Sequence, residues 1–329
     1  MVADSRPDGR VAGAYRTDRQ CGMTALLDVG CHLPARSVDI GDICVDADPK
    51  RLWTYRRLFG LQKVLRDPGQ DLRPLLVAAV DSLTELRGNE HRVRYVVLGR
   101  TIVPAVRAGE TLLEDVCVTL GLPNAVAFTL TQHACAAGLL AVDLAGQLLA
   151  ADGDPDALAL VLTGEKAFAP ILETIPESTV MGEATAACLV TANGERDRLL
   201  GVATRTLGQF AESVPPQPLH PDFVKDHNEV LAEVIRQACR NAGVDIDDLA
   251  LLLPHNVNML SWSWTCRLLD VPLERVYLDN IAVTGHCFGA DPFVNYVHAR
   301  AADRLRPGDL YLMAAVGLGA TFTAAVLRH

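Results

Sequence analysis

Aromatic residues are scarce in this chain, at 5% of its 329 positions, although half of all residues are hydrophobic. The core must therefore be built mainly from leucine, valine and alanine, which suits β-sheets covered by helices. A chain of this length can form two core-containing layers or two similar subdomains.

The nine cysteines include no Cys-x-x-Cys pair and follow no regular spacing. Several stand in apolar runs, such as Cys188 between Ala187 and Leu189. This usage argues against a disulfide framework and is typical of reduced, cytoplasmic proteins. No histidine or cysteine pair has the spacing of a zinc finger or of an HExxH site, so we expect no metal.

A basic patch is also lacking, and the net charge is −10, so we expect no nucleic-acid partner. No uncharged apolar run approaches the roughly 18 residues of a membrane span. The first 20 residues mix arginines with aspartates and contain no apolar stretch, unlike a signal peptide. We therefore expect a flexible tail over residues 1–23 and a cytoplasmic protein that does not bind membranes.

Short apolar segments alternate with helical patterns along the rest of the chain. Strands are expected at 24–30, 94–99, 125–131, 157–163, 184–190, 249–254, 275–278, 310–315 and 320–327, and helices at 72–87, 110–120, 223–242, 257–269 and 291–304. This order is typical of α/β layers with mostly parallel strands. The proline-rich stretch 211–221 is interpreted as a crossing loop, and the two halves have a similar element order.

Cys135 stands where an expected strand runs directly into an expected helix. Its neighbours at 134–138 are alanines and a glycine, so the chain can turn sharply there. A thiol in the first turn of a helix feels the positive end of the helix dipole, which favours the thiolate. The same residue could also be a small core cysteine, and this stretch alone leaves both interpretations open.

Two histidines occupy comparable junctions. His255 follows the apolar run 249–254, and His286 lies in a glycine-flanked segment before a helix that Asp291 is expected to cap. The glycine-rich turn around Gly319 could donate a backbone N–H to an oxyanion, or could be a simple hairpin. A thiol with imidazole partners is the arrangement for covalent acyl chemistry.

Taken in order, these motifs resemble the ketoacyl-acyl-carrier-protein synthase III branch of the thiolase superfamily. The segment 134–138 resembles the family's nucleophile motif, the segment Pro254-His255-Asn256-Val257-Asn258 resembles its Pro-His-Gln-Ala-Asn motif, and Gly285-His286 falls where the family has Gly-Asn. Gly319 and the strand after it resemble the closing glycine turn. Together with weaker matches, the motifs span most of residues 24–328.

The resemblance implies an α/β fold, the thiolase-like five-layered α-β-α-β-α sandwich of two similar halves. The N-terminal half (24–195) would carry the nucleophile, and the C-terminal half (196–329) would carry the catalytic histidines. The resemblance also implies a homodimer, with the sheet region before Cys135 at the interface. It implies no bound cofactor, because acyl-CoA or a phosphopantetheinyl acyl carrier protein would be the substrate and partner.

The sequence departs from the family at two places. His286 replaces the catalytic asparagine, which gives a Cys-His-His set as in the elongating ketosynthases. Phe59-Gly60-Leu61 stands where the family has Thr-Gly-Ile near the pantetheine tunnel. Trp53 and Arg57 match the adenine-binding tryptophan and arginine only loosely, and Asn258 is the third candidate for carrier binding. These departures favour a carrier-protein donor over CoA.

The implied reaction begins with attack of Cys135 on an acyl thioester, with the N–H groups of Cys135 and Gly319 as the oxyanion hole. His255 and His286 would then stabilise the enolate formed as a malonyl-type thioester loses CO2. This is decarboxylative condensation, as in fatty-acid or polyketide-type metabolism. Non-condensing transfer to an alcohol or amine, with His255 as general base, is the alternative. A non-catalytic ketosynthase partner subunit is the third interpretation.

Overall fold

The computed structural model describes residues 24–45, 47–102, 111–214 and 217–329. The tail expected over 1–23 lies outside the described residues. The strands are β1 (Ala25–His32), β2 (Ser37–Asp39), β3 (Lys63–Leu65), β4 (Val93–Gly99), β5 (Val126–Leu130), β6 (Leu158–Glu165), β7 (Thr174–Ile175), β8 (Thr179–Val180), β9 (Ala184–Thr191), β10 (Arg198–Thr206), β11 (Leu249–Leu253), β12 (Leu310–Gly317) and β13 (Thr321–Arg328). The helices are α1 (Ile40–Ile43), α2 (Pro49–Arg57), α3 (Leu72–Asp81), α4 (Leu112–Thr119), α5 (Ala137–Asp152), α6 (Pro221–Ala242), α7 (Met259–Leu269), α8 (Ile281–Thr284) and α9 (Asp291–Ala301).

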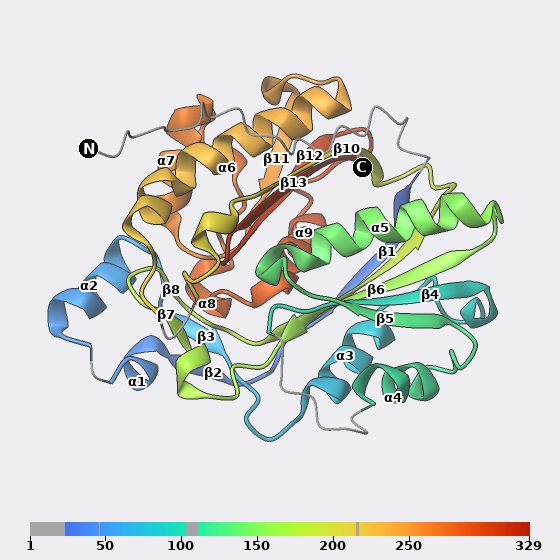
Figure 1. The fold of residues 1–329 in the computed structure, drawn as a ribbon, viewed down its shortest axis with the longest axis horizontal. Helices are drawn as coiled ribbons and strands as arrows, with labels where there is room; N and C mark the ends of the chain where they lie inside the picture. Colours follow the sequence, from blue (N-terminus) through green and yellow to red (C-terminus); the bar gives the residue numbers. More distant parts are fainter. Residues whose placement is uncertain (1–23, 46, 103–110, 215–216) are drawn as a thin grey trace, which may run out of the picture.

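The main sheet has the strand order β11-β12-β13-β10-β1-β9-β6-β4-β5. Its two portions are joined at β1 and β10, which pair only at Ala25 and Arg198. Figure 1 shows α5 and α9 between the two portions, α6 and α7 outside the C-terminal portion, and α3 and α4 outside the N-terminal one. The resulting layers are helix, sheet, helix, sheet and helix, and the expected five-layered fold is confirmed.

Each pair of layers is held by its own apolar cluster. The central cluster joins α5 and α9 to both sheet portions, with Ala145 and Phe293 as examples of its buried side chains. The two outer clusters join α6 and α7 to the C-terminal strands and α3 and α4 to the N-terminal strands. Burial of this apolar surface stabilises the stack.

Helix α5 is apolar on all sides because it lies between two sheets. With the turn before it, it forms a 19-residue segment, Ala134–Asp152, whose length and composition alone would allow it to cross a membrane. In the structure, however, 56% of its most apolar window is buried inside the protein. A central core helix accounts for this segment.

The sequence-based prediction of mostly parallel strands is wrong. The pairs β4–β5, β4–β6 and β11–β12 are parallel, whereas β1–β9, β6–β9, β10–β13 and β12–β13 are antiparallel. Strand β10 was not predicted because it is no continuous apolar run: its burial alternates, with Leu199, Gly201 and Ala203 turned inward. The strand expected at 275–278 is only a single bridge between Val276 and Leu252.

Helix α3 ends at Asp81 and not at residue 87, because the chain turns there to satisfy a buried carboxylate. Asp28 on β1 accepts hydrogen bonds from the backbone N–H groups of Thr84 and Glu85, at 2.6 and 3.1 Å. A buried carboxylate without such donors would be costly. The long-range partner therefore overrides the helical pattern of this segment.

A second buried carboxylate ties the C-terminal half together. Asp197 precedes β10 and accepts hydrogen bonds from the hydroxyls of Tyr296 and Tyr311 at 2.7 and 2.8 Å, and it also contacts His329 Nδ1 at 2.8 Å. We expect Asp197→Asn to lower the free energy of unfolding by about 2 kcal/mol, because an amide group leaves buried donors without an acceptor.

Urea unfolding followed by tryptophan fluorescence measures this change. Asp303→Asn is a matched control, since Asp303 is exposed and has the same left-handed backbone, with φ of 53° at both positions. A loss of stability that is equal in the two variants would contradict the role given to Asp197.

Candidate active site

Cys135 lies in a short 3-10 turn, Ala134–Ala136, that leads from β5 into α5. The hairpin of β12 and β13 packs directly on this turn. A Cβ atom at Gly317 would stand 2.0 Å from the carbonyl oxygen of His133, so only glycine permits the contact. The elbow is therefore held against the hairpin that carries Gly319.

The thiol of Cys135 faces an imidazole that is itself backed by a carboxylate. His286 Nε2 lies 3.3 Å from Cys135 Sγ, and His286 Nδ1 lies 2.5 Å from Asp291 Oδ2. All three side chains are buried: Cys135 is 4% exposed, His286 is 1% exposed and Asp291 is 0% exposed. This is the thiol–imidazole–carboxylate line that activates a nucleophile in unrelated hydrolases.

Asp291 is fixed by further donors on the protein backbone. Its carboxylate accepts from the N–H of Asn256 at 2.6 Å and from the N–H of Cys287 at 2.7 Å. His286 in turn donates its backbone N–H to the carbonyl of Val180 at 3.1 Å. Both members of the pair are thus held in place before any substrate arrives.

The expectation that Asp291 caps α9 is replaced by this role. Ala290 is the N-cap residue, and Asp291 is the first residue of the helix. The sequence indicates that Asp291 could bind His286 only through their separation of five positions across the start of a helix. This signal is weak unless the fold is known.

The Asp291 carboxylate keeps His286 protonated. Burial by itself would lower the pKa of His286, but the negative charges of Asp291 and the Cys135 sulfur outweigh it and raise that pKa to about 10. A buried imidazolium favours a thiolate as its neighbour. The pair is therefore suited to nucleophilic attack at neutral pH.

His255 has the opposite character. Burial, together with the neighbouring His286 and His227, lowers its pKa well below the ordinary histidine value. Neither of its buried ring nitrogens has a hydrogen-bond partner among the described residues. Its ring centroid is 6.0 Å from that of His286. A neutral imidazole with two free nitrogens beside a thiol is a site for a substrate's polar group.

Asparagine side chains hold the loop that carries His255. Asn295 donates to the carbonyl oxygen of Pro254 and to Asn256 Oδ1, both at 2.8 Å. Asn258 accepts from the N–H of Ser261 at 2.7 Å, which caps α7, and donates to the carbonyl oxygen of Ser178 at 3.1 Å. Asn258, a predicted carrier-binding residue, therefore also connects the start of α7 to the loop at Ser178.

Asn258 lines a cavity of about 500 Å³ between α2, α6 and α7, referred to below as the small cavity. Its lining includes Phe59, Leu219, Phe223 and His227. Trp53 and Arg57, the other two predicted carrier-binding residues, are exposed on α2 and are not part of this lining. On α2 it is Arg51 that lines the cavity.

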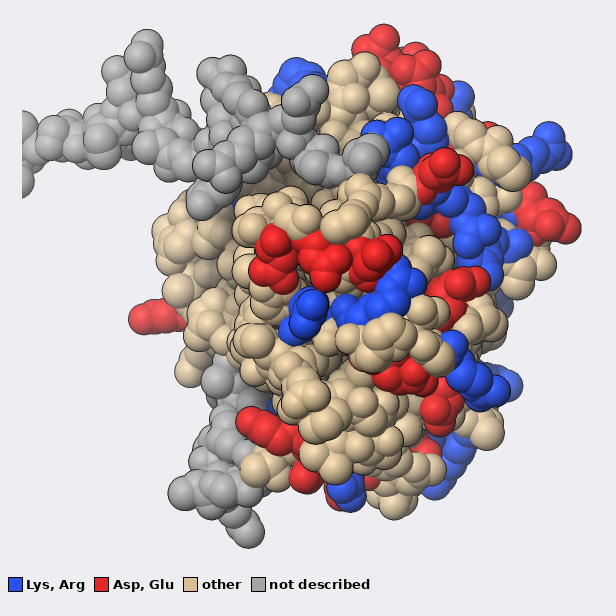
Figure 2. Space-filling view, turned by 90° about the vertical axis from the view of Figure 1, so that its right-hand side faces the viewer, with Lys and Arg blue, Asp and Glu red and all other residues tan. Residues whose placement is uncertain are grey.

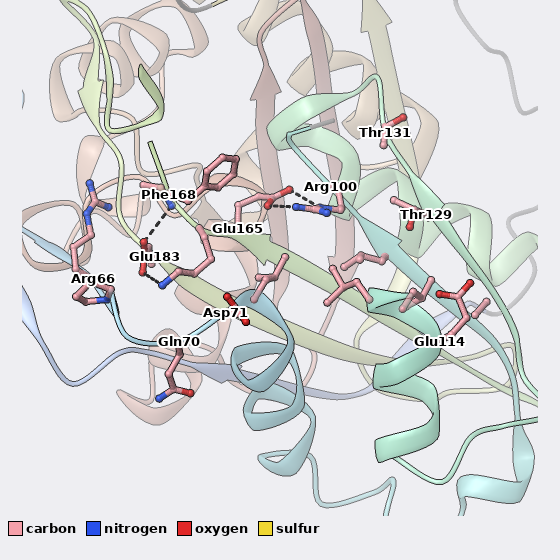
Figure 3. A pocket seen from close by; sticks show the side chains of 18 of the residues that line it. Arg66, Gln70, Asp71, Arg100, Glu114, Thr129, Thr131, Glu165, Phe168 and Glu183 are labelled. Carbon is pink, nitrogen blue, oxygen red and sulfur yellow. Dashed lines mark hydrogen bonds and ion pairs between the residues drawn. The ribbon is translucent and has the colours of Figure 1, made fainter. Parts of the chain in front are cut away.

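A larger cavity of about 880 Å³ opens on the other side of the elbow, beside β4, β5 and α3 (Figure 3). Arg100 binds Glu165 through two hydrogen bonds of 2.9 and 2.8 Å, and Lys166 binds Glu183 at 2.7 Å. These buried ion pairs support the wall of the large cavity. Glu165 and Lys166 are both buried, and both line the large cavity.

Cys135 packs in an apolar cluster that includes residues of both cavities. Ala167 of this cluster lines the large cavity, and Leu219 lines the small one. In the parts of the chain that the structure describes, no group of three or more His, Cys, Asp or Glu side chains is placed to hold a metal ion.

Charge on the surface is mixed on the side that Figure 2 shows. Acidic and basic side chains lie next to each other there and form no field of a single sign. Arg92 and Arg94, at the start of β4, form ion pairs with Asp156 and Asp154 in the loop after α5, at 3.9 and 3.4 Å. Such exposed pairs contribute little to stability.

Comparison with known proteins gives consistent relatives. Residues 239–329 match the family described as the C-terminal part of 3-oxoacyl-[acyl-carrier-protein] synthase III. The β-ketoacyl-[acyl-carrier-protein] synthase III of Nitratidesulfovibrio vulgaris is 30% identical over 233 residues, covering 64% of this chain and 68% of that protein. The enzyme of the same name from Roseiflexus is 25% identical and covers 92% of this chain and 98% of that protein.

Solved structures agree with the fold. The 3-oxoacyl-[acyl-carrier-protein] synthase III of Aquifex aeolicus superposes with a TM-score of 0.77 at 19% identity, over 93% of this chain and all of that one. The acyltransferase ChlB3 gives 0.80 at 17% identity, over 93% and 97%. The priming β-ketosynthase of the R1128 polyketide pathway gives 0.77 at 20% identity, over 93% and 96%.

Proposed function

This chain belongs to the 3-oxoacyl-[acyl-carrier-protein] synthase III family, and from that premise we propose that it is an acyltransferase that carries its acyl group on Cys135. The observation that supports this proposal best is the line from Cys135 Sγ through His286 to Asp291. It supplies a nucleophile, its proton partner and the carboxylate that orients and charges the partner.

In the first half-reaction, the Cys135 thiolate attacks the carbonyl carbon of an acyl thioester. The N–H groups of Cys135 and Gly319 stabilise the resulting oxyanion. The bond to the carrier's sulfur then breaks, and the His286 imidazolium gives its proton to the departing thiolate. Acyl-Cys135 remains, and the carrier is either CoA or an acyl carrier protein bound through its phosphopantetheine arm.

In the second half-reaction, the acyl group passes to a malonyl-type thioester with loss of CO2. The neutral His255 donates an N–H to the carbonyl oxygen of that thioester, and His286, which regains a proton from water after the carrier leaves, donates the other. Both bonds strengthen as the enolate forms, so they lower the barrier. The two unpartnered nitrogens of His255 support this role. Several relatives are named for this condensation.

A second candidate is transfer to a hydroxyl or amino group without condensation, and Asp291 favours it. An enolate made by decarboxylation carries no proton that must be removed, whereas an alcohol or amine does. A carboxylate on Nδ1 makes an imidazole a stronger base, as in hydrolytic triads. The structural neighbour ChlB3, which is called an acyltransferase, agrees with this candidate.

A role as a non-catalytic partner subunit is disfavoured, because the catalytic side chains are all retained: Cys135, His255, His286 and Asp291. We also propose a homodimer formed along β5. This strand is the edge of the main sheet, and Val126 on it is exposed, so a second copy can add hydrogen bonds there.

Intact mass spectrometry tests the proposal. After incubation with acetyl-CoA or longer acyl-CoA thioesters, we expect a mass increase equal to one acyl group. Addition of malonyl-CoA then removes the adduct and releases CO2 if the enzyme condenses, whereas an alcohol or amine removes it without CO2 if the acceptor is a heteroatom. A protein that forms no adduct with any thioester is not an acyltransferase of this kind.

A further inference from the structure

His227 is a third histidine, next to His255, and the mechanism above does not use it. It lies on α6 and lines the small cavity. Its ring packs against Phe223 and Phe322, with centroid distances of 5.5 and 5.6 Å. Packing against two aromatic rings fixes the position of the imidazole but leaves the roles of its nitrogens open.

The hydrogen bonds of Asn228 define those roles. Its side-chain oxygen lies 3.1 Å from His227 Nδ1 and accepts from the hydroxyl of Ser261 at 2.7 Å. An oxygen that serves two donors is an acceptor, so Nδ1 of the neutral ring carries the hydrogen. Nε2 is then the nitrogen with a free lone pair, which can accept a proton.

Short ring-to-ring distances connect His227 at the small cavity with the two histidines of the site. The ring of His227 is 6.3 Å from that of His255, and His255 is 6.0 Å from His286, which contacts Cys135. His255 is 1% exposed and does not line the small cavity. A molecule that enters through this cavity therefore meets His227 before it meets His255.

The surroundings keep His227 neutral. Burial lowers its pKa, although the bond to Asn228 partly offsets the effect. The ionisable side chains around it are His255 on the inner side and, at the wall of the small cavity, Arg51 and Glu177, which pair with each other at 3.4 Å. At neutral pH, an unprotonated imidazole thus stands at the end of the cavity.

We propose that His227 is a catalytic base for the acceptor, and that the acceptor taken from the small cavity carries a hydroxyl or an amino group. The inference rests on the proposed acyl-Cys135 intermediate and selects the second of the two acceptor classes. The acceptor's O–H or N–H bonds to Nε2, and its oxygen or nitrogen attacks the acyl carbon.

The atoms and charges of this step balance. The lone pair of the acceptor forms the new C–O or C–N bond, and its proton passes to His227 Nε2. The C–S bond breaks, and its electron pair returns to Cys135, which again pairs with His286 because that imidazole has regained from water the proton it gave to the carrier thiol. His227 then releases the proton to water through the cavity. His255 is left to donate its N–H to the acyl oxygen.

The experiment separates loading from transfer. Acyl-Cys135 is prepared with acetyl-CoA, freed of excess thioester and mixed with 2-phenylethanol, 2-phenylethylamine or malonyl-CoA. The two phenyl probes suit the aromatic lining of the small cavity. The decay of the adduct is followed by intact mass in the wild type, in His227→Gln, which keeps polar atoms, and in His227→Phe, which keeps an aromatic ring. His91→Gln is the matched control, because it makes the same substitution at an exposed histidine that lines neither cavity.

We expect both His227 variants to form the acyl-Cys135 adduct, which shows that they are folded, and transfer is compared from the same starting amount of adduct. Transfer to the alcohol and the amine should be about 100-fold slower in both, the usual contribution of a general base. The acidic limb of the wild-type pH profile, with a pKa below the ordinary histidine value, should disappear. Decay with malonyl-CoA should not change.

Wild-type transfer rates in either variant would overturn the inference, and so would equal slowing with malonyl-CoA, which indicates a general packing role. A wild-type acyl-enzyme that passes its acyl group to neither the alcohol nor the amine overturns it as well. All of these results leave the acyl-Cys135 intermediate intact. A wild type that never loads overturns the proposed function, and this inference with it.

Discussion

Cys135→Ala is expected to abolish acyl loading and to lower turnover by roughly 10⁴-fold or more, as loss of the nucleophile does in other covalent acyl enzymes. The methyl group of alanine fills the apolar cluster between Ala167 and Leu219 without a reactive atom. His286, His255 and Asp291 remain, but no other thiol among the described residues is hydrogen-bonded to His286. The mass of the protein after incubation with acyl-CoA should therefore equal that of the free variant.

Cys44→Ala is the matched control for this prediction. Cys44 is a less buried thiol than Cys135, but burial raises its pKa and no imidazole contacts it among the described residues. This variant should load one acyl group at the wild-type rate. An adduct that persists in Cys135→Ala, or one that is lost in Cys44→Ala, would assign the acyl group to another residue.

Asp291→Asn should have the second largest effect, a loss of about 10⁴-fold in the rate of acyl loading. An amide in place of the carboxylate removes the charge that keeps His286 protonated. It also turns an NH2 group toward Nδ1 in one of its two orientations, which favours the tautomer with hydrogen on Nε2. The thiolate then loses its charged partner, although the three side chains keep their places.

The pH dependence gives a readout that simple damage to the fold does not produce. The pKa of His286 is raised to about 10, so the imidazolium–thiolate pair should persist through neutral pH and be lost as the pH rises through that value. Without Asp291, burial dominates and the pKa of His286 falls, so the alkaline limb should move to lower pH. The rate of acyl loading as a function of pH measures this limb, because loading needs the proton that the His286 imidazolium gives to the departing thiolate.

Asp279→Asn is the control, because Asp279 is exposed and lies on the segment just before α8. It should show the wild-type profile. An Asp291→Asn variant with an unshifted alkaline limb would mean that the carboxylate only holds the loop together.

The layers of the fold could be predicted because strands such as β6 are continuous apolar runs and helices such as α6 have one apolar face. Strand direction could not, because pairing depends on which strands become neighbours. Strand β9 lies between β1 and β6 and is antiparallel to both, and no local pattern in it indicates this. Strand β10 was missed because only one of its faces is apolar.

The site was predictable where its chemistry is local. Cys135, His255 and His286 each stand at a junction whose sequence marks it as an end of an element. Asp291 and His227 could not be assigned in this way, because their roles depend on distances between separate segments. His227 lies in the middle of an ordinary amphipathic helix, and only the packing of α6 on β13 and α7 brings it next to His255.

The apolar cluster of Cys135, which includes one residue of each cavity, has a consequence for redesign of the enzyme. If Cys135 carries the acyl group as proposed, we expect that group to extend past Ala167, and carriers and acceptors to approach past Leu219. Acyl preference and acceptor preference are then encoded by separate sets of residues. Libraries built on one wall should change one preference and leave the other unaltered, so the two can be selected independently and combined afterwards.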